Sequence, residues 1–240
     1  VDASALISRA KSFINIARTE KINNNPNFIV EEASTPVLEG LKRAEKMESN
    51  RPLIPALIAQ IYIRRYEDGT KDKTYLSEAL ENINRAIRLQ KPAFLSSKDS
   101  YDGTFQKIRA YVHFLYGQHI NNQDSILSYR YAIKNIDERL SLKPDDVTSW
   151  KDKANYHFDA KELGNAYASL IRASKLAPKD PSIFIDMAFI LVENKEYKRA
   201  CQDFNRANNL IKEGLSKQGS QGAFANDYMQ QKKRMKPFTD

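Results

Sequence analysis

The chain is poor in the residues that make tight turns and covalent crosslinks. Its 240 residues include only eight glycines, nine prolines and one cysteine. Because a β-sandwich or β-barrel needs many tight turns, this shortage favours long helices with few stops. The single cysteine, Cys201, excludes an intramolecular disulfide, a zinc site built from several cysteines and a CxxC redox pair.

Long apolar runs and catalytic motifs are also missing. No stretch approaches about 18 consecutive apolar residues, so the sequence predicts no membrane-spanning helix. It has no Walker phosphate loop, no GxGxxG dinucleotide motif and no GxSxG nucleophile elbow. The histidines, His113, His119 and His157, lack the spacing of an HExxH metal site, and we interpret them as packing residues. We therefore expect no enzymatic activity, no cofactor and no metal ion.

Positive charge is in excess, but it is spread out. Lysine and arginine number 38 against 30 aspartates and glutamates, which gives a net charge of +8. The excess lies mainly in residues 51–98 and 211–240. A nucleic-acid-binding surface is typically a denser basic stripe interleaved with aromatic residues, so we do not expect a nucleic acid as the partner. Hydrophobic residues make up 41% of the chain, which is enough for a packed core.

An internal repeat is the strongest signal in the sequence. A shift of 34 residues superposes identical residues, namely Ala154 on Ala188, Ala166 on Ala200 and Arg172-Ala173 on Arg206-Ala207. Within one period the apolar residues recur at helical spacing, in two runs separated by a break near Gly164. Each period therefore predicts two consecutive helices.

The residues around these runs indicate how the helices end and pack. Pro144 and Pro178 close the second helices, and Asp145 and Asp180 precede the next ones as candidate N-caps. The recurrent alanines predict helix contacts, because a small side chain lets two helix axes approach to about 8–10 Å. We expect larger neighbours to fill the space between the helices, namely Trp150, Leu170 and Leu176.

A helix pair of 34 residues with aromatic-x3-Ala, then Ala-x3-Leu/Phe-x2-Ala, then Pro resembles the tetratricopeptide repeat. The resemblance is clear over 147–211 and degenerate over 52–146. It implies an all-α, right-handed α-solenoid of antiparallel helix pairs that ends in a C-terminal capping helix. The implied pairs span 1–50, 52–92, 102–144, 147–180 and 181–213, followed by a flexible joint and tail at 214–240.

The first two pairs carry three further expectations. We expect a linker at 23–27, a helix that begins at Thr35-Pro36 with Thr35 as its cap, and a loop at 67–74 that is about eight residues longer than the repeat requires.

The resemblance also implies where a partner would bind, because the first helices of such repeats line a concave surface. The residues expected there are Lys151, Asn155, Phe158, Ile185, Phe189 and Val192. Lys151 and Asn155 match half of the clamp with which some tetratricopeptide repeats hold a terminal carboxylate. Asp186 would repel a carboxylate, so we predict an apolar groove floor in place of a complete clamp. Contact of the Ile185–Phe189–Val192 stripe with the capping helix is the alternative.

The tail differs in composition from the repeats. Gly214, Gly219 and Gly222 predict the joint, and Phe224, Tyr228 and Met235 form a sparse apolar stripe among basic residues. One interpretation is a helix that caps the last repeat. The other is a segment that binds a partner or folds back into the groove.

We predict a non-enzymatic adaptor or scaffold that binds a segment of a partner protein through its concave face. The alternative is a cell-envelope solute-binding protein of the same repeat class, with a small-molecule cavity lined by residues 101–116. A helical-repeat RNA binder is disfavoured by the 34-residue period. Because the sequence starts at Val1, we expect a cell-envelope lipoprotein, periplasmic or anchored upstream, with a cytoplasmic location as the alternative.

Overall fold

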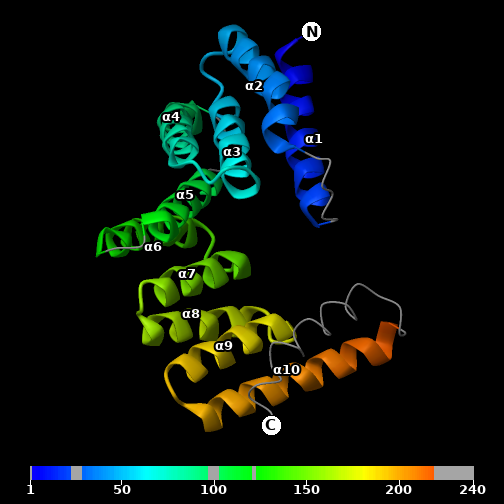
Figure 1. Cartoon of the computed structure of the whole chain (residues 1–240), viewed down its shortest axis with the longest axis vertical. Coiled ribbons are helices and arrows are strands. Elements are labelled where there is room, and N and C mark those ends of the chain that lie inside the picture. The colour runs from blue at the N-terminus through cyan, green and yellow to red at the C-terminus, as the bar shows by residue number, and fades with distance from the viewer. Residues whose placement is uncertain (1, 23–28, 97–102, 121–122, 219–240) are drawn as a thin grey trace. The chain divides into compact units, whose positions relative to one another are not determined.

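The computed structural model describes residues 2–22, 29–96, 103–120 and 123–218. In these residues the regular secondary structure consists of ten α-helices (Figure 1). Their contacts divide the chain into two compact units, Val1–Pro144 and Asp145–Asp240, which are described separately.

Unit 1 contains six helices that pack in consecutive pairs. α1 packs on α2, α3 on α4 and α5 on α6, while α2 contacts α3 and α4 contacts α5. The first helices of neighbouring pairs also meet, because α3 contacts both α1 and α5. The helices are α1 (Ala3–Ile22), α2 (Val30–Met47), α3 (Leu53–Asp68), α4 (Lys73–Ser96), α5 (Thr104–Ile120) and α6 (Gln123–Leu142).

The core of unit 1 follows the helical spacing of its small and branched residues. On α4, Ala79, Ile83 and Ala86 are fully buried and lie at positions i, i+4 and i+7, which is one helix face. This face packs into a cluster with residues of α3 and α5. A second cluster joins α1, α2 and α3 around the fully buried Leu41 and Ile54.

The start of α2 differs from the prediction. The helix begins at Val30, ahead of Thr35, and Pro36 lies inside it. Arg65 on α3 donates from Nε to Ser34 Oγ at 2.7 Å and from Nη2 to Thr35 Oγ1 at 2.8 Å. Nη2 also donates to the Glu31 carbonyl oxygen at 3.1 Å. A side chain 30 residues away from Thr35 thus supports the turn next to the proline.

The loop predicted at 67–74 is shorter than expected. α3 continues to Asp68 and α4 begins at Lys73, so only a short turn separates them. Asp72 Oδ1 accepts a hydrogen bond from the backbone N–H of Thr74 at 2.9 Å, which supports the start of α4. The linker predicted at 23–27 lies outside the described residues.

Unit 2 contains four described helices in two pairs, α7 with α8 and α9 with α10. Contacts between α8 and α9 join the pairs. The helices are α7 (Val147–Asp159), α8 (Leu163–Leu176), α9 (Pro181–Glu193) and α10 (Tyr197–Gln218).

The repeated alanines of unit 2 lie at helix contacts, as predicted. The ones that the shift superposes are all buried in a single cluster, namely Ala154, Ala166, Ala173, Ala188, Ala200 and Ala207. Leu170 is 1% exposed and fills the space between them, and Trp150 packs against the same cluster. The prediction for Leu176 is wrong, because its side chain is 43% exposed at the end of α8.

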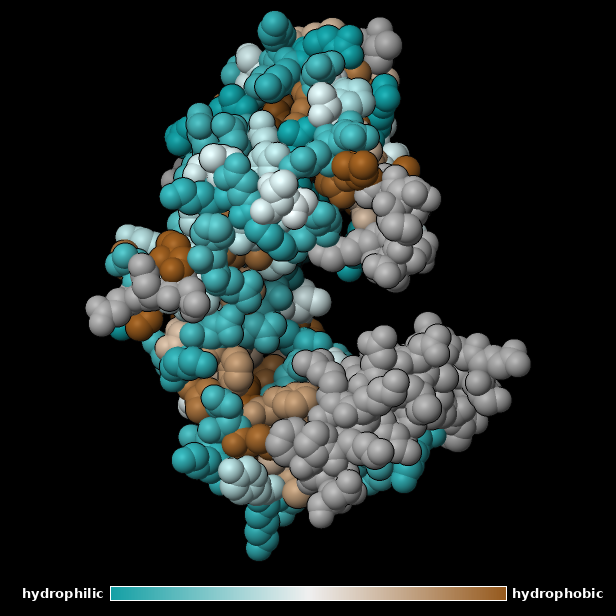
Figure 2. Space-filling view, in the orientation of Figure 1, coloured by the Kyte–Doolittle hydropathy of each residue, from teal (hydrophilic) through white to brown (hydrophobic). Residues whose placement is uncertain are grey.

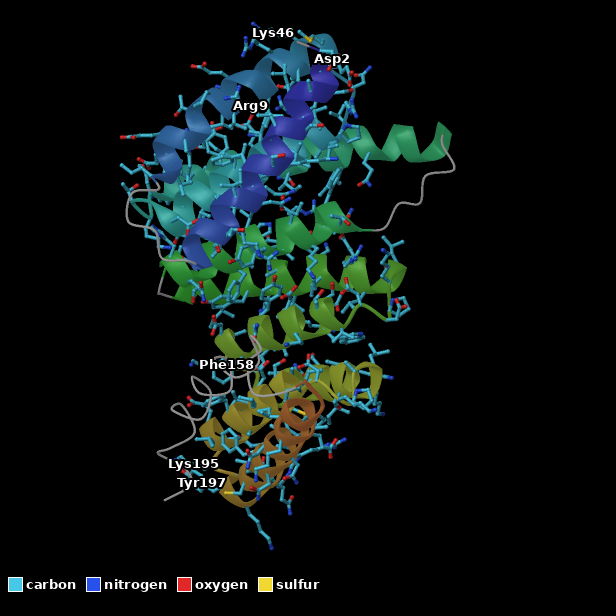
Figure 3. All side chains as sticks on the ribbon, turned by 90° about the vertical axis from the view of Figure 1, so that its right-hand side faces the viewer. Asp2, Arg9, Lys46, Phe158, Lys195 and Tyr197 are labelled. Atoms are coloured by element: carbon cyan, nitrogen blue, oxygen red, sulfur yellow. The ribbon has the colours of Figure 1, made fainter. Side chains whose placement is uncertain are left out.

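The helix ends of unit 2 repeat the same geometry. Asp180 caps α9 and accepts a hydrogen bond from Ser182 N at 2.9 Å. The cap of α7 is Asp146, so the prediction of Asp145 is off by one residue. The turns after α7 and α9 each contain a lysine in the left-handed conformation, Lys161 at φ 64° and Lys195 at φ 61°. Figure 3 shows Lys195 and Tyr197 together at the turn between α9 and α10.

α10 continues past the predicted end of the last repeat. It runs through Gly214 to Gln218, so the joint does not begin at Gly214. A single glycine in a helix costs only about 1 kcal/mol relative to alanine, which a well-packed helix tolerates. The other joint and tail residues, Gly219, Gly222, Phe224, Tyr228 and Met235, lie outside the described residues.

Hydrophilic residues cover most of the described surface in Figure 2, and hydrophobic residues form separate patches. The larger exposed hydrophobic side chains include Ile126, Leu127 and Tyr131 on α6. Among the helices in the described parts of the chain, none is long and apolar enough to cross a membrane.

Candidate functional site

A cavity of about 360 Å³ opens on unit 2 between α7 and α9. α7 contributes Phe158, which Figure 3 labels, and α8 contributes one residue to the cavity floor. Most of the wall comes from α9. The lining residues are Asn155, Phe158, Leu170, Asp186, Phe189, Ile190, Val192 and Glu193. Together they form what we call the α7–α9 groove.

The floor of the groove is apolar and held in place. Phe189 meets the buried Phe204 of α10 edge to face, with ring centroids 5.7 Å apart and an interplanar angle of 89°. Leu170 and Ile190 are 1% and 5% exposed, so both side chains are packed in the core. Only a small part of each faces the groove. Because its floor is already packed, the groove keeps its form without a ligand.

The rim of the groove carries negative charge. Asp186 and Glu193 are seven residues apart on α9, which places them on the same helix face about two turns from each other. The lining set contains no lysine or arginine. One cation lies nearby, since Lys161 Nζ is 5.7 Å from the centroid of the Phe158 ring. Two carboxylates and an exposed amide, Asn155, therefore surround an apolar floor.

Four of the six side chains expected on the concave surface meet in this groove, namely Asn155, Phe158, Phe189 and Val192. That they bind a partner stays a prediction. Ile185 does not line the groove, because it is 4% exposed and belongs to the core cluster of unit 2. Helical spacing puts Ile185 on the expected face of α9, but it does not show how much of that face the neighbouring helices cover.

Lys151 joins two helices instead of lining the groove. Its Nζ donates to Ser182 Oγ at 2.6 Å and lies 3.8 Å from Asp180 Oδ2. Ser182 Oγ in turn donates to Asp180 Oδ1 at 2.7 Å. Lys151 therefore holds α7 against the capped start of α9, and a carboxylate clamp built on Lys151 and Asn155 is not assembled.

Sequence reasoning missed three lining residues, Leu170, Ile190 and Glu193. Leu170 was assigned to the core, and the structure shows that part of it also reaches the cavity. Glu193 could have been found, because it lies at i+7 from Asp186 on the predicted groove face. No sequence signal distinguishes Ile190, which lines the groove, from Ile185, which does not.

The three histidines differ in burial. His157 is buried, with Nδ1 2.7 Å from Glu162 Oε2, as expected of a packing residue. His119 is exposed, with Nδ1 3.3 Å from the hydroxyl of Tyr66, so the interpretation of this histidine as a packing residue is wrong. Burial, and then the positive charge of Arg109, lower the pKa of His113 to about 4, so this side chain is neutral at neutral pH. In the part of the chain that the structure describes, no group of three or more histidine, cysteine, aspartate or glutamate side chains could hold a metal ion.

Three of the aromatic residues that the small-ligand alternative needs are engaged within unit 1, and Tyr101 lies outside the described residues. Tyr111 donates its hydroxyl hydrogen to Glu67 Oε1 at 2.5 Å, and the hydroxyls of Tyr116 and Ser77 are 2.7 Å apart. The Tyr111 and Phe114 rings are stacked with centroids 6.2 Å apart. These side chains join α5 to α3 and α4.

Solved structures with the same arrangement of helices are tetratricopeptide-repeat proteins. MamA from Desulfovibrio magneticus RS-1 superposes with a TM-score of 0.56 at 16% identity, over 85% of this chain and 96% of its own. YrrB, a tetratricopeptide-repeat protein with an unusual peptide-binding site, gives 0.52 at 14% identity, over 82% and 84%. The protein TTC0263 from Thermus thermophilus gives 0.56 at 12% identity, over 86% and 94%.

No known family pattern and no curated protein matches the sequence. At these identities the likeness concerns the fold. The helix pairs, the buried alanines at their crossings and the superpositions agree, and the chain has the all-α solenoid fold of the tetratricopeptide-repeat proteins.

Proposed function

We propose that this chain is a non-enzymatic binding protein that holds a segment of a partner protein in the α7–α9 groove. The observation that carries the proposal is a preformed apolar floor bordered by one amide and two carboxylates. Apolar pockets with a few placed polar groups are typical of binding sites, and a groove beside a helix accommodates an extended or helical peptide.

The lining residues support an internal segment of the partner as the ligand. An apolar side chain of the segment packs on Phe189 and Val192, where it leaves water. Asn155 offers one acceptor and two donor hydrogens, which suits the carbonyl and N–H groups of a peptide backbone. Asp186 and Glu193 repel a terminal carboxylate and favour a segment with a lysine or arginine beside its apolar residue.

The similarity to YrrB supports this proposal in a general way, because that protein of the same fold has a peptide-binding site. The solute-binding alternative receives no such support. Of its expected lining, Tyr111 and Tyr116 are engaged in hydrogen bonds that join α5 to α3 and α4. The cell-envelope location stays a prediction, which fractionation of cells that express the gene at its native level would test.

A selection experiment with a matched pair of variants tests the proposed function. Peptides are selected from a display library on the immobilised full chain, and their affinities are measured for Asn155→Arg and Asn205→Arg. Both asparagines are exposed, but Asn155 lines the groove and Asn205 lies on α10 outside its lining. The two variants therefore add the same size and charge at different places.

We expect the selected peptides to bind Asn205→Arg as they bind the unmodified chain. Asn155→Arg should weaken them at least about tenfold, a loss of about 1.4 kcal/mol, with an unchanged circular dichroism spectrum. Equal affinities for the two variants would place the binding site elsewhere and refute the proposal. Detection of catalytic turnover would refute its non-enzymatic part.

A further inference from the structure

The segment that follows α10 has the charge that the α7–α9 groove lacks. Residues 219–240 contain four cations, Lys232, Lys233, Arg234 and Lys236, against the two carboxylates of Asp227 and Asp240. Apolar residues precede and interrupt the basic cluster, namely Phe224, Tyr228 and Met235. In residues 219–240, apolar residues thus precede a run of cations. Such a segment is complementary to the α7–α9 groove, which has an apolar floor and carboxylates at its rim.

The groove carries the opposite charges in a compatible order along α9. Asp186 comes first, Phe189 and Val192 follow, and Glu193 comes last. A segment that runs along α9 from its N-terminal end therefore passes Asp186, then meets the apolar floor, and reaches Glu193 last. In residues 219–240, Tyr228 likewise precedes Lys232 by four residues.

The length of α10 brings the start of this segment within reach of the groove. α9 and α10 form an antiparallel pair joined by a short turn, and α10 has 22 residues against 13 in α9. At 1.5 Å per residue, α10 extends about 13 Å past the N-terminal end of α9. Phe189 lies about 12 Å along α9 from this N-terminal end. The sum of the two lengths is the distance between Phe189 and Gln218 along the helix axis, about 25 Å.

Ten residues connect Gln218 to Tyr228, and an extended chain of that length spans at most about 35 Å. Tyr228 can thus reach Phe189, whereas Phe224, only six residues from Gln218, falls short at about 20 Å. The four residues from Tyr228 to Lys232 then cover the single helical turn between Phe189 and Glu193.

We propose that residues 219–240 are a ligand of the α7–α9 groove in their own chain. In this arrangement Tyr228 packs on Phe189, and the cations of Lys232–Arg234 lie against Glu193. The inference rests on the proposed function, because it concerns the same groove. It states that residues 219–240 of the chain itself fill this groove when no partner segment is bound. A partner segment of the same chemistry, an apolar residue beside lysine or arginine, then binds by displacing this one.

Carboxyl-to-amine crosslinking of the full chain tests the contact directly. A zero-length carbodiimide reagent joins a carboxylate to a lysine amine only when the two touch, and mass spectrometry of the monomer fraction identifies the pairs. Lys151 and Asp180, with 3.8 Å between Nζ and Oδ2, provide an internal positive control. We expect crosslinks from Glu193 to Lys232, Lys233 or Lys236.

The matched variant is Lys232→Glu/Lys233→Glu/Arg234→Glu, which changes no described helix. It should lose the tail crosslinks, including those to Lys236, and keep the control crosslink. A salt concentration of about 1 M should also reduce them, because it shortens the Debye length to about 3 Å. A monomer that forms the control crosslink without any groove-to-tail crosslink would overturn the inference.

A labelled synthetic peptide of residues 224–238 provides the second measurement. It should bind the triple variant about tenfold more tightly than the unmodified chain, because the competing segment at high effective concentration has been removed. Adding Asn155→Arg to the triple variant should abolish this binding. Equal affinity for the triple variant and the unmodified chain would contradict occupation of the groove by the tail.

The two proposals can fail separately. If no groove-to-tail crosslink forms but library peptides still distinguish Asn155→Arg from Asn205→Arg, this inference is wrong and the proposed function stands. If the crosslinks form but no library peptide distinguishes those variants, the groove serves only its own chain and the proposed function is wrong.

Discussion

Gly117 on α5 is a position where one added methyl group should destabilise unit 1. A Cβ at Gly117 would lie 2.4 Å from Cε1, 2.7 Å from Cδ1 and 2.8 Å from Cζ of Tyr129. Carbon atoms in contact are normally about 3.5–4.0 Å apart. Tyr129 is 7% exposed, and the Phe114 ring lies 5.9 Å from it, so the tyrosine ring has little room to move.

The expected cost is the difference between two terms. Alanine stabilises a helix interior by about 1 kcal/mol relative to glycine. Overpacking a filled site typically costs about 1–3 kcal/mol, and an overlap with three ring atoms indicates the upper half of that range. We therefore expect Gly117→Ala to lower the free energy of unfolding by about 1–2 kcal/mol, despite its better helix propensity.

Equilibrium urea unfolding followed by circular dichroism measures this effect. Gly214→Ala on α10 is the control, because no described atom lies within 4 Å of its added Cβ, and it should gain up to about 1 kcal/mol. Repeating Gly117→Ala in a Tyr129→Ala background should remove the cost, since the overlapping ring is gone. A stabilising Gly117→Ala, or a cost that persists without the ring, would refute the reasoning.

Three further predictions follow from helix ends and from a half-buried histidine. Lys161→Gly and Lys195→Gly should each stabilise unit 2 by about 1 kcal/mol in urea unfolding, because both lysines are left-handed; a loss of stability would contradict this account. Asp180→Ala should cost about 1 kcal/mol by removing the cap of α9, and an unchanged midpoint would show that the cap contributes nothing. His113 has a folded pKa of about 4, lowered by burial and by Arg109, against an ordinary value of 6.5. The unfolded chain therefore binds the proton first, and stability should fall by up to about 3 kcal/mol as the pH drops from about 6.5 to about 4. In urea unfolding, the stability of His113→Gln should depend less on pH than that of the unmodified chain. The same pH dependence in both proteins would refute the assignment to His113.

The repeating elements of this fold could be predicted because their signals are local. Ala166, Ala173 and Leu170 recur at the spacing of one helix face, and they are buried as that spacing indicates. Asp180 precedes a helix start and caps it. These features depend on the residues of a single helix or turn, so no knowledge of distant contacts was needed.

Two of the errors occurred where a distant residue decides the outcome. Pro36 was predicted near a helix start, but Arg65 supports the preceding turn and α2 begins earlier. Lys151 was predicted in the groove, but Ser182 and Asp180 hold its ammonium group. Neither partner is marked by a pattern within the same helix.

The sequence by itself determined that the chain is helical, that its helices come in pairs, and which face of each helix carries the small residues. Those properties follow from helical periodicity and from the turn residues, which act over a few positions. The tertiary structure decided how much of each face stays exposed. Phe189 and Ile185 share one face of α9, yet Phe189 lines the groove and Ile185 is buried. Burial depends on which neighbouring helices cover a face, and that is set by contacts between residues far apart in the chain.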